Sequence, residues 1–183
     1  MGRSMRDLDA ADSELLRRFR RGDEQAFTAI VQRFQHRICR LCAVWLSDPQ
    51  LVEDAAQEVF LRSYQGLRRF RFRSAPFTWL YRTTRNVCHE FNRIRRDDAL
   101  PELADDGPGP AGELQRYEAA RRLRAVLAEL PPRQQEVVLL RVFEDLPVRE
   151  TARAMGCREG TVKALLHQAT QSLRGLLDEE HAG

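Results

Sequence analysis

Apolar residues recur every three or four positions along most of this chain, whereas strict alternation of apolar and polar residues is nearly absent. Spacing of three and four places apolar side chains on one face of an α-helix, and alternation would indicate a strand. The pattern therefore predicts an all-α fold. The clearest apolar stripe consists of Phe27, Ile30, Val31, Phe34, Ile38, Leu41 and Trp45.

Capping and helix-breaking residues divide the first half of the chain into four expected helices. Asp, Ser and Asn favour the N-cap position, and proline favours the first helical turn. Gly22-Asp23 ends the first helix and caps the second, and Ser47-Asp48-Pro49 starts the third. The expected helices run from Asp12 to about Arg21, from Asp23 through Trp45, from Pro49 to about Tyr64, and from Pro76 to about Arg96.

Residues 97–112 interrupt the helical pattern. The segment is acidic, contains three prolines and three glycines, and has few large apolar residues, which is typical of a flexible linker. It divides the chain into two small helical domains, residues 1–96 and residues 113–183. In the second domain helices are expected from about Glu113 to Pro131, from Arg133 to Phe143, from Val148 to Met155, and from Glu159 to about Leu177.

The last two of these helices have the layout of a helix-turn-helix. A short helix, a turn at Gly156 and a longer helix with a regular apolar stripe follow one another. In this motif the second helix lies in the major groove of DNA. Arginine bonds guanine edges and glutamate accepts from cytosine, whereas Lys163 and Arg141 suit phosphate contacts. The predicted DNA-binding residues of this domain are Arg141, Arg158, Glu159, Thr161, Lys163 and His167.

Charge is distributed unevenly along the chain. The net charge of the 183 residues is only +3, but the segment from Arg62 to Arg96 holds ten arginines and a single glutamate. Arginines and aromatic residues interleave in it, and this mixture binds phosphates and stacks unpaired bases. The predicted contacts of this segment are Phe70, Arg71, Phe72, Arg73, Ser74, Trp79, Arg82, Arg85, Asn86, His89 and Arg93, although core packing is the competing interpretation of Trp79.

Several classes of function are disfavoured. No apolar run approaches the ~20 residues that span a bilayer, and no signal peptide opens the chain, so a cytoplasmic protein without membrane insertion is expected. Paired acidic metal sites, nucleophile–base pairs and glycine-rich phosphate loops are missing, so we expect no enzyme, no cofactor and no small-molecule substrate. His36, Cys39 and Cys42 do not converge on one helix face. Buried thiols are favoured there over a metal site or a redox sensor.

The chain resembles the extracytoplasmic-function (ECF) sigma factors of bacterial RNA polymerase, within the sigma-70 superfamily, over nearly its whole length. The resemblance rests on motifs in the family's order, and each alone is moderately specific. They are Gly22-Asp23 with Ala26-Phe27, the run Glu53 to Leu61, Phe77 to Arg82 with Arg85-Asn86, the run Leu130 to Arg141, and Gly160-Thr161-Val162-Lys163.

The resemblance implies a non-enzymatic subunit that directs promoter-specific transcription initiation. Its expected partners are the clamp and flap regions of core RNA polymerase, promoter DNA and an anti-sigma factor. The first domain would recognise and melt the minus-ten element, with a flipped base held by the loop Phe70–Ser74, and the second would bind the minus-thirty-five element. The residues expected to bind core polymerase are Asp54, Gln57, Glu58, Phe60, Leu61 and Arg62.

One departure from the family pattern bears on upstream recognition. Leu165, Gln168 and Thr170 occupy positions that are usually basic, and each lost phosphate contact should weaken DNA binding. The alternative function is a stand-alone helix-turn-helix transcriptional regulator. Such a regulator would bind duplex DNA tightly without polymerase, but it would leave the arginine-rich segment unexplained.

Overall fold

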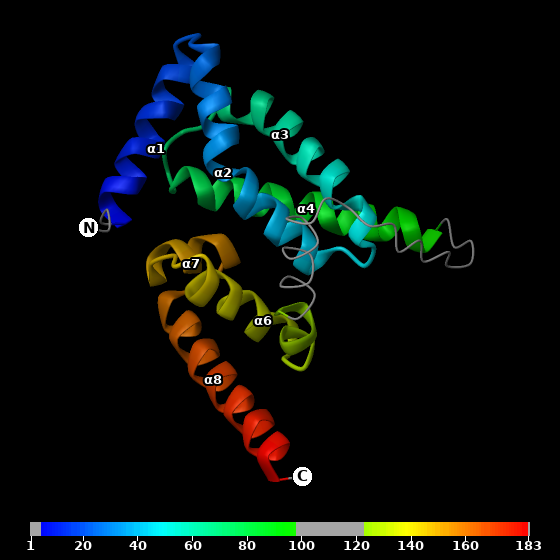
Figure 1. Ribbon diagram of the computed structural model, residues 1–183. Helices are drawn as coiled ribbons and strands as arrows, with labels where there is room; N and C mark the ends of the chain where they lie inside the picture. The colour runs from blue at the N-terminus through cyan, green and yellow to red at the C-terminus, as the bar shows by residue number, and fades with distance from the viewer. Residues whose placement is uncertain (1–4, 98–122, 183) are drawn as a thin grey trace. The chain divides into compact units, whose positions relative to one another are not determined.

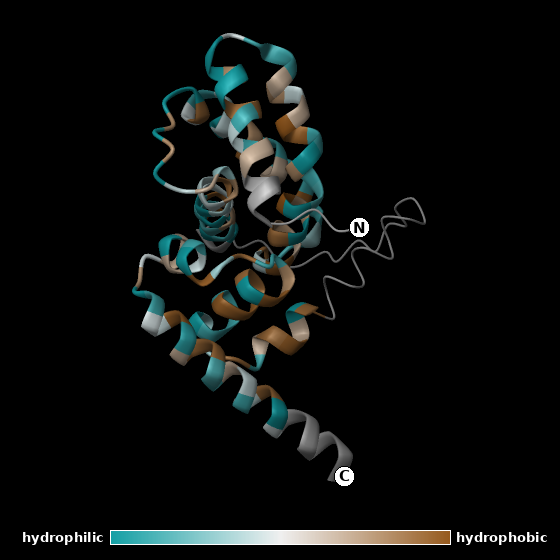
Figure 2. Ribbon diagram, turned by 90° about the vertical axis from the view of Figure 1, so that its left-hand side faces the viewer, coloured by the Kyte–Doolittle hydropathy of each residue, from teal (hydrophilic) through white to brown (hydrophobic). Residues whose placement is uncertain are grey.

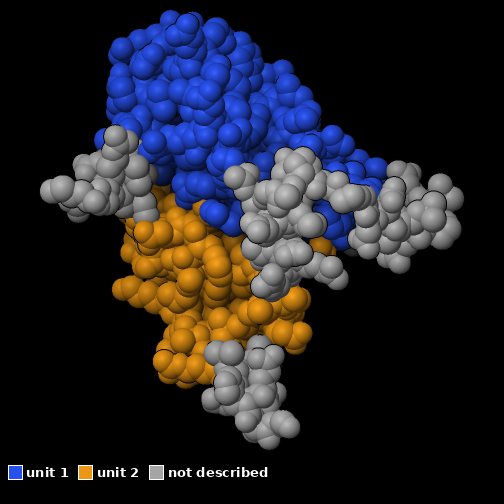
Figure 3. All heavy atoms as spheres, in the orientation of Figure 1, with its two compact units in different colours: residues 1–121 blue, residues 122–183 orange. Residues whose placement is uncertain are grey.

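A computed structural model describes residues 5–97 and 123–182 of the chain, with the side chains of residues 10–95 and 123–175. The described residues form helices and contain no strand, which confirms the predicted all-α fold. The chain divides between residues 121 and 122 into two compact units, unit 1 and unit 2 (Figure 3). The expected linker lies almost entirely outside the described residues, as does the start of the helix expected from Glu113.

The described part of unit 1 is a bundle of four α-helices (Figure 1). Helix α2 (Glu24–Trp45) packs against α1 (Met5–Arg20), α3 (Val52–Arg68) and α4 (Pro76–Asp97). Its apolar stripe is the core of the bundle, because Ile30, Phe34, Ile38 and Leu41 are all at most 2% exposed. The periodicity of the sequence therefore predicted the central helix and its buried face.

Two of the expected helix starts are confirmed in detail. Asp23 caps α2, with its side chain accepting a hydrogen bond from the backbone N–H of Ala26 at 3.2 Å. Asp48 caps a short 3₁₀ turn, Pro49–Leu51, that leads into α3, and its side chain accepts from the N–H of Gln50 at 2.9 Å. Satisfying these otherwise unpaired N–H groups fixes where each helix begins.

The expected start of the first helix is wrong. Helix α1 begins at Met5, so Asp12 lies in its middle rather than at its N-cap. The Asp12 carboxylate is buried and forms an ion pair with Arg33 of α2. A tertiary partner on another helix therefore accounts for this aspartate. Helices α3 and α8 (Glu159–Ala182) also run further than expected, to Arg68 rather than Tyr64 and to Ala182 rather than Leu177.

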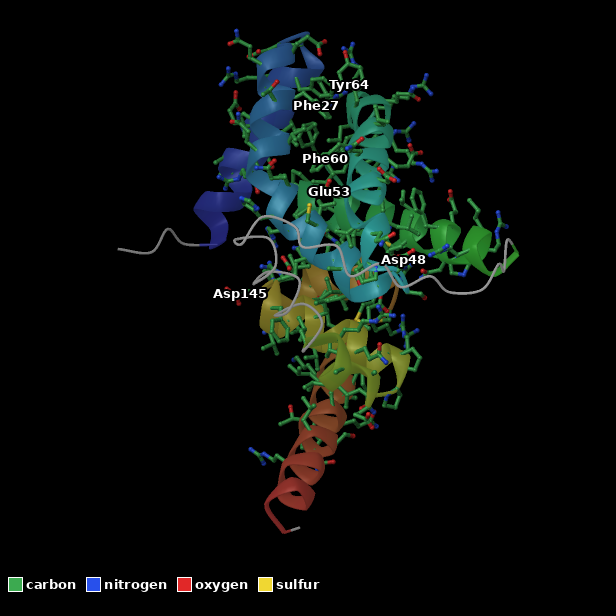
Figure 4. The ribbon with its side chains drawn as sticks, turned by 45° about the vertical axis from the view of Figure 1, so that its right-hand side comes forward. Phe27, Asp48, Glu53, Phe60, Tyr64 and Asp145 are labelled. Carbon is green, nitrogen blue, oxygen red and sulfur yellow. The ribbon has the colours of Figure 1, made fainter. Side chains whose placement is uncertain are left out.

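An aromatic cluster joins α1, α2 and α3. The rings of Phe19, Phe27 and Tyr64 contact one another pairwise, with centroids 5.0–5.4 Å apart. Figure 4 shows Phe27 and Tyr64 facing each other between α2 and α3. The Tyr64 hydroxyl donates to Glu24 at 2.9 Å, so the polar end of the ring is also satisfied. The cluster holds the C-terminal end of α3 beside the end of α1.

Unit 2 begins with a helical segment over residues 123–128, followed by α6 (Pro132–Val138) and a π-helical turn, Leu139–Phe143. The helix expected from Arg133 to Phe143 therefore changes hydrogen-bonding pattern halfway. Helix α7 (Val148–Met155) follows a turn in which Asp145 has a φ of +49°, and α8 packs on both α6 and α7. Aspartate is one of the few residues that tolerate this conformation.

The helices of both units carry hydrophobic and hydrophilic residues side by side, as Figure 2 shows. This is the pattern of helices that bury one face and leave the other in water. Within the described part of the chain, no helix is both long and apolar enough to cross a lipid bilayer.

Candidate nucleic-acid interface

The arginine-rich loop predicted to capture an unpaired base lies between α3 and α4, over residues 69–75. Arg71 and Arg73 are exposed on either side of Phe72. Phe72 has a φ of +52°. A left-handed conformation is uncommon for a bulky residue, costs roughly 1–3 kcal/mol, and occurs most often at functional sites. The backbone of the loop is therefore held by its surroundings rather than by local preference.

The two phenylalanines of the loop are placed differently. Phe70 is only 6% exposed, so its ring belongs to the core and is not open to a base in this conformation. Phe72 is half-buried and meets the Phe70 ring edge-on, with centroids 5.3 Å apart. Phe70 thus anchors Phe72, and the side chains directly available to DNA are Arg71 and Arg73.

Trp79, another predicted contact, is half-buried where α4 crosses α3. Its indole lies against Gly66, so closely that a Cβ atom on that residue would be 2.4 Å from Cζ2 of the ring. Most of the Trp79 ring therefore serves the packing of α3 on α4, which was the competing interpretation of this residue.

Five of the contacts predicted on α4 lie together on one face of the helix and form a polar stripe. The opposite face of the helix is buried, with Leu80, Tyr81, Thr84 and Val87 all inaccessible to solvent. The stripe therefore points outward with a predominance of positive charge, which suits a duplex phosphate backbone. The exposed residues of the stripe are Arg82, Arg85, Asn86, His89 and Arg93.

The face of α3 predicted to bind core polymerase divides into two parts. Asp54, Gln57 and Leu61 are exposed, and Leu61 is 66% exposed, which is unusual for a large apolar side chain. Glu58 and Phe60 are partly covered. Figure 4 shows Phe60 between Glu53 and Tyr64 along the helix. The exposed part combines one acidic, one amide and one apolar side chain, which is a composition suited to a protein partner.

Arg62 lies at the edge of this face that is next to α4. Its guanidinium donates to Glu58 at 2.6 Å and forms an ion pair with Glu90 of α4 at 2.8 Å. The hydrogen bonds that Arg62 donates to Glu90 and to Glu58, the first having the larger effect, raise the pKa of Arg62, and Arg62 in turn lowers the pKa of Glu90. Arg62 therefore joins two helices of unit 1, a role that the sequence pattern did not reveal.

The helix-turn-helix is formed by α7, the turn at Gly156 and α8. Gly156 has a φ of +65°, as expected for a residue that reverses the chain after a helix. Val162 and Ala169 are fully buried on the inner face of α8. The predicted DNA contacts Arg158, Glu159, Thr161, Lys163 and His167 are all exposed.

Arg141 is placed differently from these residues. It lies in the π-helical turn, and its guanidinium donates to the backbone carbonyl of Leu146, just before α7. This bond fixes the turn that carries Asp145. Arg141 therefore supports the start of the helix-turn-helix, and its predicted phosphate contact would have to use the remaining guanidinium donors.

The three positions that depart from the family pattern lie on α8. Gln168 and Thr170 are exposed, and the Thr170 hydroxyl donates to the carbonyl of Leu166 at 2.8 Å. Leu165 is half-buried, so only part of this apolar side chain faces the solvent. Among the described side chains on the outer face of α8, the exposed basic residues are Lys163 and Arg174, and Gln168 and Thr170 add no charge between them.

The cysteines of α2 do not gather with His36. Cys42 is fully buried against Cys88 of α4, and His36 is exposed. The contact with Cys88, and then burial, raise the pKa of the Cys42 thiol, so it stays protonated and poorly nucleophilic. Among the described side chains no group of three His, Cys, Asp or Glu could hold a metal ion.

Two residues that lie against the loop were not predicted from the sequence as part of the site. Arg17 and Arg20 of α1 lie over the Phe72 ring, at 5.5 and 5.4 Å from its centroid. In the sequence they belong to a run of arginines on a solvated helix face, and nothing in their spacing points to a phenylalanine more than 50 residues away.

Comparison with protein families identifies both units. Residues 30–99 match the family described as "Sigma-70 region 2", and residues 120–173 match "Sigma-70, region 4". A Pseudomonas aeruginosa "RNA polymerase sigma-H factor" is 31% identical over 176 residues, covering 88% of this chain and 91% of the relative. An "ECF RNA polymerase sigma factor SigM" from Mycobacterium tuberculosis is 30% identical over 176 residues, covering 96% of this chain and 89% of that relative.

Solved structures with the same fold include two that were determined as complexes. CnrH, determined in complex with the cytosolic domain of CnrY, superimposes with a TM-score of 0.73 at 22% identity, covering 92% of this chain and 98% of CnrH. The sigma factor RpoE, determined in complex with the anti-sigma factor NepR from Bartonella quintana, gives a TM-score of 0.62 at 20% identity, covering 83% of this chain and 96% of RpoE.

Proposed function

Because this chain belongs to the ECF family of RNA polymerase sigma factors, we propose that it binds core RNA polymerase and directs initiation at specific promoters. It acts in the cytoplasm and catalyses no reaction itself. The observation that carries the proposal is the pairing of two different DNA-binding surfaces in one chain. A helix-turn-helix in unit 2 suits duplex DNA, and an arginine-rich loop in unit 1 suits an unpaired strand.

In this proposal unit 1 opens the minus-ten element. The exposed Arg71 and Arg73 hold the phosphates of the single strand while the loop around Phe72 accommodates an unstacked base. The positive stripe on α4 lies along the adjoining duplex. Trp79 contributes by packing α4 on α3, and any base contact would use the exposed edge of its ring.

Unit 2 binds the minus-thirty-five element as duplex. Glu159 and Arg158 stand at the start of α8, where a recognition helix meets base edges, and Lys163 meets a phosphate one turn later. Because Gln168 and Thr170 supply no charge, the isolated chain should bind duplex DNA weakly, and core polymerase should be needed for stable binding.

Two protein partners follow from family membership. The exposed Asp54, Gln57 and Leu61 on α3 bind the clamp of core polymerase, and unit 2 binds the flap. A cognate anti-sigma factor binds the chain and blocks these surfaces. The complex of RpoE with the anti-sigma factor NepR supports this part of the proposal, because it pairs a sigma factor of the same fold with such a partner.

The direct test is run-off transcription with bacterial core RNA polymerase and this protein on a library of randomised promoters. We expect discrete start sites and selection of sequence elements near minus ten and minus thirty-five. Core polymerase without the protein is the control. Tight, sequence-specific duplex binding by the protein alone, with no initiation in the presence of core, would instead favour a stand-alone regulator.

A further inference from the structure

One side of the Phe72 ring is covered by α1, a helix that is separate from the arginine-rich loop and from α4. Arg17 and Arg20 stand one turn apart on α1, and both guanidiniums lie over this ring, 5.5 and 5.4 Å from its centroid. A cation over an aromatic face is attracted by the ring quadrupole. The Phe70 ring supports Phe72 edge-on.

Each arginine is itself oriented by a second contact. The Nε of Arg20 donates to the backbone carbonyl of Arg68 at 3.2 Å, at the C-terminal end of α3, where helix carbonyls lack intrahelical partners. Arg17 forms an ion pair with Glu14 at 3.0 Å on its own helix. Each guanidinium therefore has a second contact besides the Phe72 ring, to a backbone carbonyl for Arg20 and to a carboxylate for Arg17.

This arrangement offers a reason for the left-handed backbone of Phe72. A bulky residue keeps a φ of +52° only when its surroundings favour that conformation over the commoner ones. Contacts from Arg17, Arg20 and Phe70 provide those surroundings. With the Phe72 ring turned toward α1, the neighbouring Arg71 and Arg73 side chains are exposed.

We infer that Arg17 and Arg20 are positioning residues for minus-ten recognition, because they hold Phe72 in the conformation that presents Arg71 and Arg73 to the melted strand. The inference rests on the proposed function and adds a part of α1 to its site. The two arginines act through the Phe72 ring rather than by touching DNA.

The test uses holoenzyme formed from core polymerase and the full chain, on a promoter selected by the unaltered protein. Unpaired thymines in the open complex are detected with permanganate, affinity for core is measured by competition, and base preference is measured with a library randomised at the minus-ten element. The double variant Arg17→Met/Arg20→Met should lower open-complex formation on the order of tenfold. It should also flatten minus-ten base preference and leave core affinity unchanged.

Two further variants separate positioning from direct contact. In a Phe72→Leu background, removing both arginines should cause no additional loss of opening, because the ring through which they act is already gone. Phe72→Tyr keeps an aromatic ring under the arginines, so in that background removing both arginines should still lower open-complex formation on the order of tenfold. The charge-matched control is Arg18→Met/Arg21→Met, because Arg18 in the last turn of α1 and Arg21 just after it are both exposed, and Arg18 pairs with Asp23.

The contrary outcomes are distinct. A full additional loss in the Phe72→Leu background would mean that the arginines contact DNA directly, and a loss equal to that of the control pair would mean that only net charge matters. Either result overturns the inference, as does unchanged opening or a parallel fall in core affinity. Unaltered protein that opens no promoter would overturn the proposed function and this inference with it.

Discussion

The indole ring of Trp79 lies directly on the backbone of Gly66, where α4 crosses α3, and a Cβ atom at Gly66 would be 2.4 Å from Cζ2 and 2.6 Å from Cη2 of the ring. Only a residue without a side chain allows the two helices to approach this closely. The contact links the end of α3, which precedes the arginine-rich loop, to the start of α4, which follows it.

Gly66→Ala should therefore destabilise unit 1 even though alanine favours helices. Forcing a methyl group against the indole costs about 1–3 kcal/mol, more than the gain in helix propensity of about 1 kcal/mol. Chemical denaturation measures the change. Gly175→Ala is the control, because a Cβ there meets nothing within 4 Å. Adding Trp79→Phe should recover part of the loss, and strict additivity of the two changes would contradict the contact.

Asp12→Ala tests the ion pair between α1 and α2. It leaves Arg33 without its carboxylate partner in a largely covered position, which should lower the free energy of unfolding by about 1–3 kcal/mol. Glu14→Ala removes an exposed carboxylate from the same helix and should change stability much less. Equal effects of the two substitutions in urea denaturation would show that the Asp12–Arg33 pair adds nothing.

The Arg62–Glu90 pair should make the α3–α4 contact depend on pH. Arg62 lowers the pKa of Glu90 in the folded protein, so the ionised carboxylate stabilises the fold above its unfolded-state pKa. This contribution should be lost as the pH falls through the lowered folded-state pKa. At pH 7 the unaltered protein should be more stable than Glu90→Gln, by only a small amount because both partners are partly exposed. In strong acid this difference in stability should vanish. If the stability difference persists unchanged in strong acid, it arises from packing of the Glu90 side chain and not from its charge.

Asp54→Arg with Gln57→Arg should weaken binding to core polymerase without unfolding the chain. Both residues are exposed on α3, and reversing the charge of an interface rim slows association and weakens complementarity. A competition assay against the unaltered protein measures the loss. Gln32→Arg, which is exposed on α2 rather than on α3, is the control. If the double variant and the control bind core polymerase with equal affinity, the face around Asp54 is not part of the interface.

Two substitutions on α8 should affect upstream DNA in different ways. Lys163→Ala should weaken binding of holoenzyme to the minus-thirty-five element for all sequences and reduce the salt dependence by about one counterion. Glu159→Gln should instead change which bases are preferred, because its carboxylate accepts from cytosine. Selection from a library randomised at that element measures both. Unaltered base preference in Glu159→Gln would exclude Glu159 from readout.

The amino-acid sequence alone determined the features that depend on neighbours along the chain. Helix caps at Asp23 and Asp48, the chain reversal at Gly156 and the buried stripe of α2 are all set by local chemistry and helical period, so they could be predicted. For the same reason the exposed faces of α4 and α8 were predictable, because a residue out of phase with the core must face away from it.

Only the tertiary structure decided which side chains meet across helices. Phe70 and Phe72 have the same local surroundings in the sequence, yet one is buried and the other lies under two arginines of α1. Asp12 was expected to begin the first helix until its partner on α2 was known, and Arg62 was expected only as a contact for core polymerase until Glu90 was placed beside it. Such pairings depend on how helices distant in sequence pack together, and a periodic pattern specifies the buried face of each helix but not its partner.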